Sequence, residues 1–476
     1  MKKLSNLLLA LFLCVSMSGC ATNNNTTEPN EPSETATTVV NEETTTTVVV
    51  GAGGAGMMTA IELTQGGQDV ILLEKMPNAG GATLLAATYF VAVDTQLQKD
   101  ADMAVTVEDY VAQQVKNNPY FNGELYTKLL NSSEESLQWL NDRGANLTRA
   151  MSSYQIGIVD GSSLGARLVE ILKKECETVG VDLRTKTQVT EILMDNGKAV
   201  GVKATGPEGE VVIHAENVVL ATGGYAASAD MVEEFAPTWV GTPSTTAAGC
   251  TGDGHRLAAA AGANLTHMES VRMNPAVYTA ENGASYSLSV ARAEGGILVN
   301  EEGKRFCNDY FPDYTQLSQW MIEQEGDNIH IVFDQKSVDT SARLAKFKEQ
   351  GFLIEAPTLE ELAELINVPA ENLVETVNRY QTFVDNGVDE DFGRDKNMNT
   401  RIDQAPFYAV AVKPGIQVTL GGIDVNNDLQ VLKADGSTIS GLYAIGECAD
   451  DGLFGAGPTA IDITLGRELG QHLLAK

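Results

Sequence analysis

The residues best suited to chemistry lie in a glycine-rich turn near the start of the chain. An apolar run, Thr46 to Val50, leads directly into Gly51-Ala52-Gly53-Gly54-Ala55-Gly56, and a second apolar run ends in Glu74. In such a strand–helix–strand unit the first glycine permits a tight turn, the second lets the backbone approach a pyrophosphate, and the third lets the helix pack on the strand. The helix N-terminus offers N–H groups to phosphates, and the acid can bind a ribose. The pattern predicts a dinucleotide site.

Further glycine-rich segments follow this unit along the chain. A glycine pair comes soon after Glu74, an apolar strand ends in Thr-Gly-Gly, and a Gly-Glu pair ends another strand near the C-terminus. Glycines at these places let the chain pass close to a bulky ligand. The candidate cofactor-binding residues are Gly51, Gly53, Gly54, Ala55, Gly56, Glu74, Lys75, Gly80, Gly81, Ala82, Thr83, Ala221, Thr222, Gly223, Gly224, Asp253, Gly446, Glu447, Thr459 and Ala460.

The order of these motifs resembles that of the soluble fumarate reductase and succinate dehydrogenase flavoprotein family. That family also contains urocanate reductases and 3-ketosteroid dehydrogenases. The resemblance covers about residues 46–476 and implies FAD as the cofactor. The matching segments are Val48–Gly56, Glu74–Gly81, Leu220–Tyr225, Thr251–Gly254, Gly296–Asn300, Gly303–Phe306 and Gly441–Glu447.

The resemblance implies an α/β fold of the glutathione-reductase type, in which a Rossmann-like FAD-binding domain carries an inserted α+β capping domain. The FAD-binding domain is expected at 46–235 and 366–476, and the mobile cap at 236–365. The helix that begins near Thr459 is expected to direct its positive end at the flavin. The sequence has no good match to the family's covalent flavin-attachment pattern, so we expect non-covalent FAD.

The resemblance also implies where a proton donor would lie. In the family, the flavin N5 gives a hydride to one alkene carbon and a side chain of the cap gives a proton to the other. The donor of fumarate reductases is an arginine shortly after a segment that corresponds to Gly303–Asn308, and Asp313 stands at that position here. A one-residue shift makes Tyr314 the candidate, as in ketosteroid dehydrogenases, and a phenol can donate a proton. Both residues remain candidates.

A second arginine of the family's proton relay has a match in Arg292. The threonine and glutamate of that relay are replaced by Leu288 and Ser289. Glu294 lies close by in the sequence and either substitutes for the missing acid or is a surface acid. For Arg292 the alternative to an active-site role is a structural ion pair.

The cationic residues that bind a dicarboxylate are missing. Asn274 stands where the family has a histidine, no histidine occurs within 416–420 directly before the turn at Gly421, and no arginine occurs within 455–460. Buried carboxylates need such partners, so fumarate is not the expected substrate. Aromatic residues of the expected cap and of the late flavin segment suit an apolar, neutral or aryl substrate with one carbonyl, or simply form core. These residues are Tyr278, Tyr286, Tyr310, Phe311, Tyr314 and Phe454.

Three functions are compatible with this pattern. The leading hypothesis is an FAD-dependent reductase of an activated C=C bond in a small enoate or enone. The same geometry in reverse gives a desaturase of a ketone substrate, and loss of chemistry would give a non-catalytic flavin-binding lipoprotein. The sequence has no haem-attachment motif and a single GxGxxG, so a reductase would take electrons from a separate donor protein.

The first residues resemble a bacterial lipoprotein signal. Two lysines precede a short apolar stretch, and small residues precede Cys20, which would carry the lipid. We expect a signal peptide at 1–19 and a disordered tether at 20–45, which is rich in Thr, Asn, Glu and Pro. The protein is therefore expected outside the cytoplasm, attached to the bacterial cell membrane only through this lipid.

The net charge of −32 argues against nucleic acid as a partner, because phosphate contacts need a basic surface. Cys176, Cys250, Cys307 and Cys448 are scattered without metal-binding spacing, which predicts buried thiols, with a disulfide left open.

Overall fold

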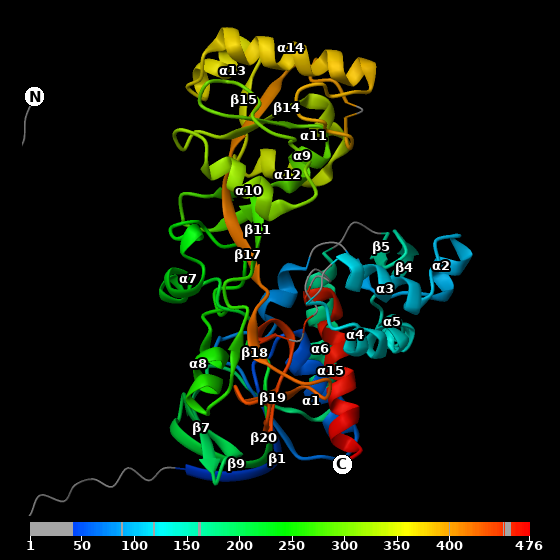
Figure 1. The fold of residues 1–476 in the computed structure, drawn as a ribbon, viewed down its shortest axis with the longest axis vertical. Coiled ribbons are helices and arrows are strands. Elements are labelled where there is room, and N and C mark those ends of the chain that lie inside the picture. Colours follow the sequence, from blue (N-terminus) through cyan, green and yellow to red (C-terminus); the bar gives the residue numbers. More distant parts are fainter. Residues whose placement is uncertain are drawn as a thin grey trace, which may run out of the picture. The chain divides into compact units, whose positions relative to one another are not determined.

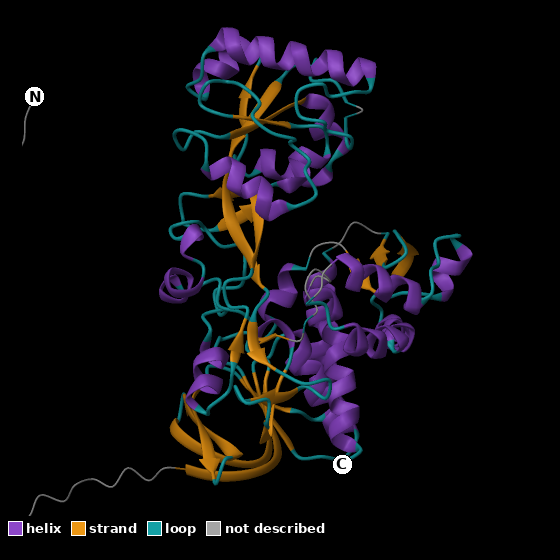
Figure 2. Cartoon of the chain, in the orientation of Figure 1, coloured by secondary structure: helices purple, strands orange, loops and turns teal. Residues whose placement is uncertain are grey.

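The computed structural model describes residues 41–86, 89–117, 120–159, 163–398, 400–450, 452 and 458–476, the last range without the side chains of 458–460. The expected signal peptide, Cys20, most of the expected tether and Phe454 lie outside the described residues. Figure 1 labels the elements along the chain, and Figure 2 distinguishes helices from strands.

The FAD-binding domain is built around one large mixed sheet. Its central strands run parallel, because β1 pairs with both β2 and β9, and β9 pairs with β20. Val48, Val49 and Val50 of β1 are buried, as expected for a strand covered on both faces. In spatial order the strands are β19 (Gln430–Leu432), β20 (Thr438–Ala444), β8 (Lys198–Gly206), β9 (Gly209–Leu220), β1 (Asn41–Val50), β2 (Val70–Leu73) and β6 (Asp182–Arg184), and β7 (Gln188–Asp195) pairs with β8.

Helices pack against this sheet and against one another. The first helix of the dinucleotide unit, α1 (Gly54–Gln65), contacts both α6 (Leu164–Val179) and α15 (Pro458–Leu474) (Figure 1). No helix in the described ranges is long and apolar enough to cross a membrane. A smaller part of the domain comprises η1 (Gly81–Leu85), β3 (Tyr89–Val91), α2 (Gln96–Asp100), α3 (Val107–Asn117), α4 (Gly123–Asn131), α5 (Ser133–Asp142), β4 (Leu147–Ala150) and β5 (Gln155–Ile158).

The cap has a four-stranded antiparallel sheet with helices on both faces (Figure 2). Alternate residues of β13 show this: Leu298 packs with the core of α10, α11 and α12, whereas Ile297 and Val299 pack with α13 and α14. In spatial order the strands are β13 (Ile297–Val299), β14 (His330–Asp334), β16 (Phe407–Ala411) and β15 (Ile354–Ala356). The helices are α9 (Ser289–Ala293), α10 (Tyr314–Ile322), α11 (Gln335–Thr340), α12 (Ala342–Glu349), α13 (Leu359–Leu365) and α14 (Ala370–Asn386).

The chain enters and leaves the cap through two paired strands, β11 (Val271–Thr279) and β17 (Lys413–Thr419), with β12 (Ser285–Ser287) beside β11. A short sheet on the FAD-binding side joins β10 (Leu265–Thr266), β18 (Gly422–Asp424) and β21 (Ala449–Asp450). The remaining helical elements are α7 (Ala229–Phe235), η2 (Pro237–Trp239), α8 (Asp253–Ala260) and η3 (Gly446–Cys448).

The expected domain boundaries need correction at three places. Residues 366–411, expected in the FAD-binding domain, belong to the cap, because β16 pairs with β14 and the apolar face of α14 closes the same core. Conversely, residues 253–260 of the expected cap form α8, whose Leu257 and Ala258 are part of the main core. The expected tether is too long, since residues 41–45 pair with residues 211–215 of β9 and extend β1. These pairings join residues far apart in sequence, so local composition did not reveal them.

Candidate functional site

The glycine turn between β1 and α1 forms one wall of a cleft in the FAD-binding domain. Gly51 has a φ of +105°, and a Cβ there would overlap the carbonyl of Ala221. A Cβ on Gly56 would overlap the carbonyl of Gly51, so this glycine allows α1 to pack on the turn. By contrast, a Cβ on Gly53 would meet no protein atom within 4 Å, although the residue lines the cleft. The turn therefore leaves space where a pyrophosphate would lie.

Glu74 is held at the end of β2 by two backbone hydrogen bonds. Its carboxylate accepts from Ala52 N–H at 2.9 Å and from Met76 N–H at 2.7 Å. The side chain is buried and lines the cleft. Because a carboxylate can accept about four hydrogen bonds, capacity remains for two ribose hydroxyls.

Lys75 and Asp253 form an ion pair in the wall of the cleft. Lys75 Nζ lies 2.9 Å from Asp253 Oδ2, which also accepts a hydrogen bond from Gln188 at 3.2 Å. Burial by itself would raise the pKa of Asp253, but hydrogen bonds from Thr251 and Lys75 hold it below its usual range. The two predicted residues thus come together from segments far apart in the sequence.

Most of the other predicted cofactor residues line the same cleft, including Gly54, Ala55, Gly81, Ala82, Thr83, Ala221, Thr222, Gly223, Gly446 and Glu447. Gly56, Gly80 and Gly224 instead support its walls: Gly80 N–H donates to Ala52 O at 2.8 Å, and a Cβ on Gly224 would overlap Glu447. The backbone of Thr459 and Ala460 lies in the first turn of α15, but their side chains lie outside the described part of the chain. The loop 247–250 also lines the cleft and was not predicted, because its only signal in the sequence is a run of small residues.

Glu447 is a buried acid at the edge of the cleft. Its Oε1 accepts from Thr419 N–H at 3.1 Å and from Thr419 Oγ1 at 3.4 Å. Burial raises the pKa of this carboxyl to about 7, although hydrogen bonds from Thr419 and from the backbone of Gly224 oppose the shift. The side chain therefore titrates near neutral pH and ties the end of β17 to the cleft.

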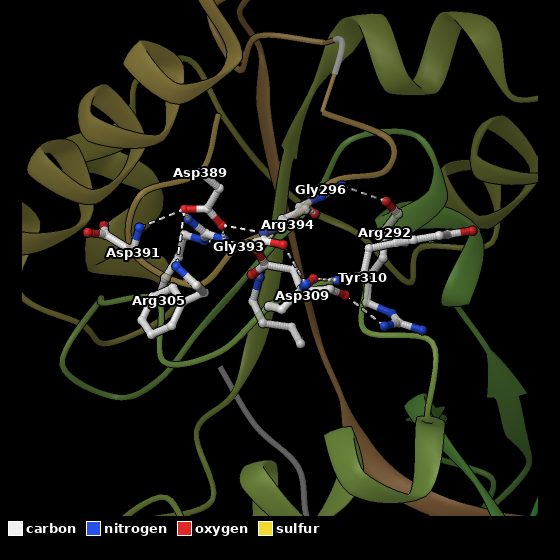
Figure 3. A network of polar contacts seen from close by, with 12 residues as sticks. Arg292, Gly296, Arg305, Asp309, Tyr310, Asp389, Asp391, Gly393 and Arg394 are labelled. Carbon is white, nitrogen blue, oxygen red and sulfur yellow. Dashed lines mark hydrogen bonds and ion pairs between the residues drawn. The ribbon is translucent and has the colours of Figure 1, made fainter. Parts of the chain in front are cut away.

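The cap contains a buried network of charged residues, shown in Figure 3. Asp309 accepts two hydrogen bonds from Arg305, at 2.5 and 2.9 Å, and Arg305 also lies 2.8 Å from Asp389. Arg394 donates to the carbonyl of Arg292 at 3.1 Å and lies 3.6 Å from Asp309. Each charge in this group has an opposite partner, which burial requires. The network fixes the backbone around Arg292.

The predicted relay residue Arg292 lies at the edge of this network. Its Nη1 donates to the carbonyl of Asp309 at 2.7 Å, while its Nε and Nη2 have no hydrogen-bond partner within the described residues. Burial lowers the pKa of the guanidinium. The guanidinium carbon lies 4.9 Å from the ring centre of Tyr314 and 5.9 Å from that of Tyr310. The cation thus faces a candidate proton donor.

The other predicted catalytic residues differ in their surroundings. Asp313 is exposed and caps α10, where its Oδ1 accepts from Thr315 N–H at 2.9 Å and from Gln316 N–H at 3.0 Å. Glu294 accepts a hydrogen bond from Thr340 of α11 at 3.2 Å, and no contact with the guanidinium of Arg292 is present in the described structure. The structure therefore brings Tyr314, but not Glu294, to Arg292.

The aromatic residues that were expected to cluster in the cap instead form separate contacts in its core. Tyr278 and Tyr286 pack on Phe352, with ring centres 4.7 and 4.8 Å apart, and Phe311 packs on Trp320 at 4.8 Å. These rings do not form one wall with Tyr314, because they serve the cap core. A different aromatic group, made of Tyr89, Tyr110, Tyr126 and Tyr154, lies on the FAD-binding side.

Comparisons with known proteins identify relatives of this chain. It matches the FAD binding domain family over residues 46–460. It is 31% identical to the NADH:fumarate oxidoreductase of Klebsiella pneumoniae (strain 342) over 439 residues, covering 89% of this chain but 46% of that protein, so the chain spans about half that relative's length. It is 30% identical to the vinyl phenol reductase of Lactiplantibacillus plantarum (strain ATCC BAA-793 / NCIMB 8826 / WCFS1), covering 83% and 88% of the two chains. The fold is similar to the open conformation of a flavocytochrome c3 fumarate reductase, with a TM-score of 0.81, 29% identity, and coverage of 91% and 78%.

The glycine turn yields a matched pair of substitutions. Gly53→Ala should leave the cofactor-free protein as stable as the wild type, because its Cβ meets no protein atom, but should weaken FAD binding about tenfold or more by occupying the pyrophosphate space. Gly56→Ala should instead lower the unfolding temperature, because its Cβ overlaps Gly51. Fluorescence titration with FAD and thermal unfolding of the cofactor-free protein measure the two effects. Unchanged FAD affinity in Gly53→Ala would contradict the assignment of this turn.

Glu447 should make the stability of the cofactor-free protein depend on pH. The folded pKa of about 7 exceeds the ordinary value of 4.5, so the folded state holds the proton while the unfolded state releases it. This contribution to the free energy of unfolding is complete below about pH 4.5 and is lost as the pH rises to about 7. Glu447→Gln should remove that loss. Urea unfolding between about pH 5 and pH 8 measures it, and parallel curves for both proteins would refute the shift.

Proposed function

Because the chain belongs to the FAD binding domain family and is an FAD-dependent oxidoreductase related to the fumarate reductases, we propose that it reduces an activated C=C bond of a small organic acceptor. The acceptor is an enoate or enone other than fumarate. When bound, FAD supplies the two electrons as a hydride. The remaining chemistry, which is binding the acceptor and delivering a proton, falls to residues of this chain.

The contact between Arg292 and Tyr314 carries this proposal. A phenol that gives up its proton becomes an anion, and a buried guanidinium 4.9 Å from the ring centre stabilises that anion. Tyr314 can therefore donate the proton that completes the reduction. Asp313 is less suited, because its carboxylate is exposed and already accepts two backbone hydrogen bonds at the start of α10.

The surroundings of the expected dicarboxylate site argue against fumarate. Asn274 donates to Ser287 at 2.7 Å and accepts from Ser289 at 3.1 Å, so its amide is engaged within the cap. Gln417 stands before the Gly421 turn without a positive charge. A relative whose name specifies a vinyl phenol, and thus no dicarboxylate, supports an acceptor of this kind.

We also propose that electrons come from a separate donor protein, since the sequence has one GxGxxG motif and no haem-attachment motif. The FAD is non-covalent in this proposal. The basic and apolar start of the sequence and the small residues before Cys20 support a lipid anchor at that cysteine and a site of action outside the cytoplasm, at the cell membrane.

Acceptor specificity tests the reaction. The FAD-loaded protein, reduced with a viologen dye under anaerobic conditions, should be reoxidised by an aryl acrylate or an enone and not by fumarate. Stopped-flow absorbance of the flavin measures the rate for each acceptor. Rapid reoxidation by fumarate would show that other residues bind both carboxylates. Oxidation of a saturated ketone with an artificial electron acceptor, without enoate reduction, would favour a desaturase.

The proton donor is tested by Tyr314→Phe and Asp313→Asn as a pair. Tyr314→Phe should lower kcat about 100-fold or more with little change in KM, because only the transferable proton is lost. Asp313→Asn should leave kcat within about threefold, because asparagine also caps helices. The reverse result, with kcat lost in Asp313→Asn alone, would assign the proton to Asp313.

A further inference from the structure

Arg272 lies on a strand that connects the wall of the cofactor cleft to the helix of the proton donor. It is on β11, opposite Val418 of β17, and its neighbour Val271 pairs with Thr419. The N–H of Thr419 donates to Glu447, which lines the cleft. On the other side, the carbonyl of Val271 accepts a hydrogen bond from Thr315 of α10 at 3.4 Å. The backbone thus places Arg272 between the wall of the cofactor cleft and α10, the helix that carries Tyr314.

The side chain of Arg272 is half-buried and has no ion-pair partner among the described residues. No hydrogen bond or ion pair of its side chain occurs among the described residues, although the buried Arg305 and Arg394 are both paired. Burial lowers the pKa of the Arg272 guanidinium, and the nearby Tyr89, Tyr154 and Asp313 oppose that shift. Asp313 is exposed and its Oδ1 is engaged in capping α10. A half-buried cation without a partner can bind an anion and thereby balance its charge.

We propose that Arg272 binds the single carboxylate of the acceptor and that the substrate is an aryl-substituted monocarboxylic enoate. This inference rests on the proposed function and specifies its substrate class. A guanidinium binds a carboxylate through two parallel hydrogen bonds. The rings of Tyr89 and Tyr154, in an edge-to-face pair 6.2 Å apart, lie within the electrostatic reach of the same arginine and suit an aryl group.

The position of the positive charge also suits the reaction. Hydride addition to the β-carbon of an enoate moves the C=C electron pair towards the α-carbon and the carboxylate oxygens. Arg272 stabilises that developing negative charge, and Tyr314 then gives its proton to the α-carbon. One hydride and one proton are added, and the product is the saturated acid. A single cation balances one carboxylate, which agrees with the loss of the dicarboxylate residues.

Cinnamate and its neutral amide, cinnamamide, test this inference because they differ only at the carboxyl group. The FAD-loaded, viologen-reduced wild type should prefer cinnamate. Arg272→Gln should lower the ratio of kcat/KM for cinnamate over cinnamamide about 100-fold, and Arg272→Lys should lower it less. Arg379→Gln, which removes an exposed cap arginine paired with Asp391, should keep the wild-type ratio. The FAD content and unfolding temperature of each variant are measured alongside.

Binding without turnover gives a second readout. Cinnamate should perturb the absorbance of the oxidised flavin in the wild type, with a Kd that rises about 100-fold in Arg272→Gln. An unchanged selectivity ratio and Kd in Arg272→Gln would overturn the role of Arg272, and reduction of cinnamamide as well as cinnamate by that variant would leave the proposed function standing. If cinnamate binds through Arg272 but no acceptor reoxidises the flavin, the proposed reduction fails and the anion site remains.

Discussion

The buried carboxyl of Glu447 joins three segments on which the site depends. It accepts hydrogen bonds from Thr419 at the end of β17 and from the backbone of Gly224 after β9, and it follows Gly446 in the cleft wall. Gly224 must be a glycine, because a Cβ would overlap this carboxyl. One side chain thereby fixes the edge of the cofactor cleft and the strand that returns from the cap. The positions of β11, Arg272 and α10 all follow from that strand.

Electrostatics divides the arginines of the cap region into two classes. Arg305 and Arg394 lie in a network with Asp309 and Asp389 in which each buried charge is balanced, so they stabilise the fold around them. Arg292 carries unpartnered nitrogen atoms beside the ring of Tyr314. The balanced network of Arg305 and Arg394 fixes the backbone around Arg292, so the fold can hold the buried, unbalanced cation of Arg292. The charge that the fold leaves unbalanced is available for chemistry.

From local patterns alone, the sequence predicted residues that the structure places in the wall of one cleft. Gly51, Gly53 and Glu74 needed only the strand–helix–strand spacing, and the family suggested by their order was confirmed by the comparisons. Glu294 was too close to Arg292 in sequence to judge from spacing. Arg292 lies within α9, whereas Glu294 follows its last residue and accepts a hydrogen bond from Thr340 of α11.

The cap boundaries depended on long-range strand pairing, which no local pattern encodes. β16 joins β14 across a separation of about 75 residues, so the helical pattern of α14 gave no sign of the core that it closes. Arg272 was missed for a related reason. The role of a single charged residue on an apolar strand can be inferred only when its neighbouring strands are known. Here the neighbour is β17, which pairs with β11.

The two strands that carry these residues are also the connections of the cap. β11 leads into it and β17 leads out, and they pair along most of their length. A side chain on β11 is therefore positioned by both connections at once, and any movement of the cap must carry through the pair of Val271 and Thr419. Since Thr419 is bound to Glu447 in the cleft wall, Arg272 stays close to the cofactor side while α10 belongs to the cap. Binding of one anion at Arg272 and delivery of one proton from Tyr314 then depend on the same short stretch of paired backbone.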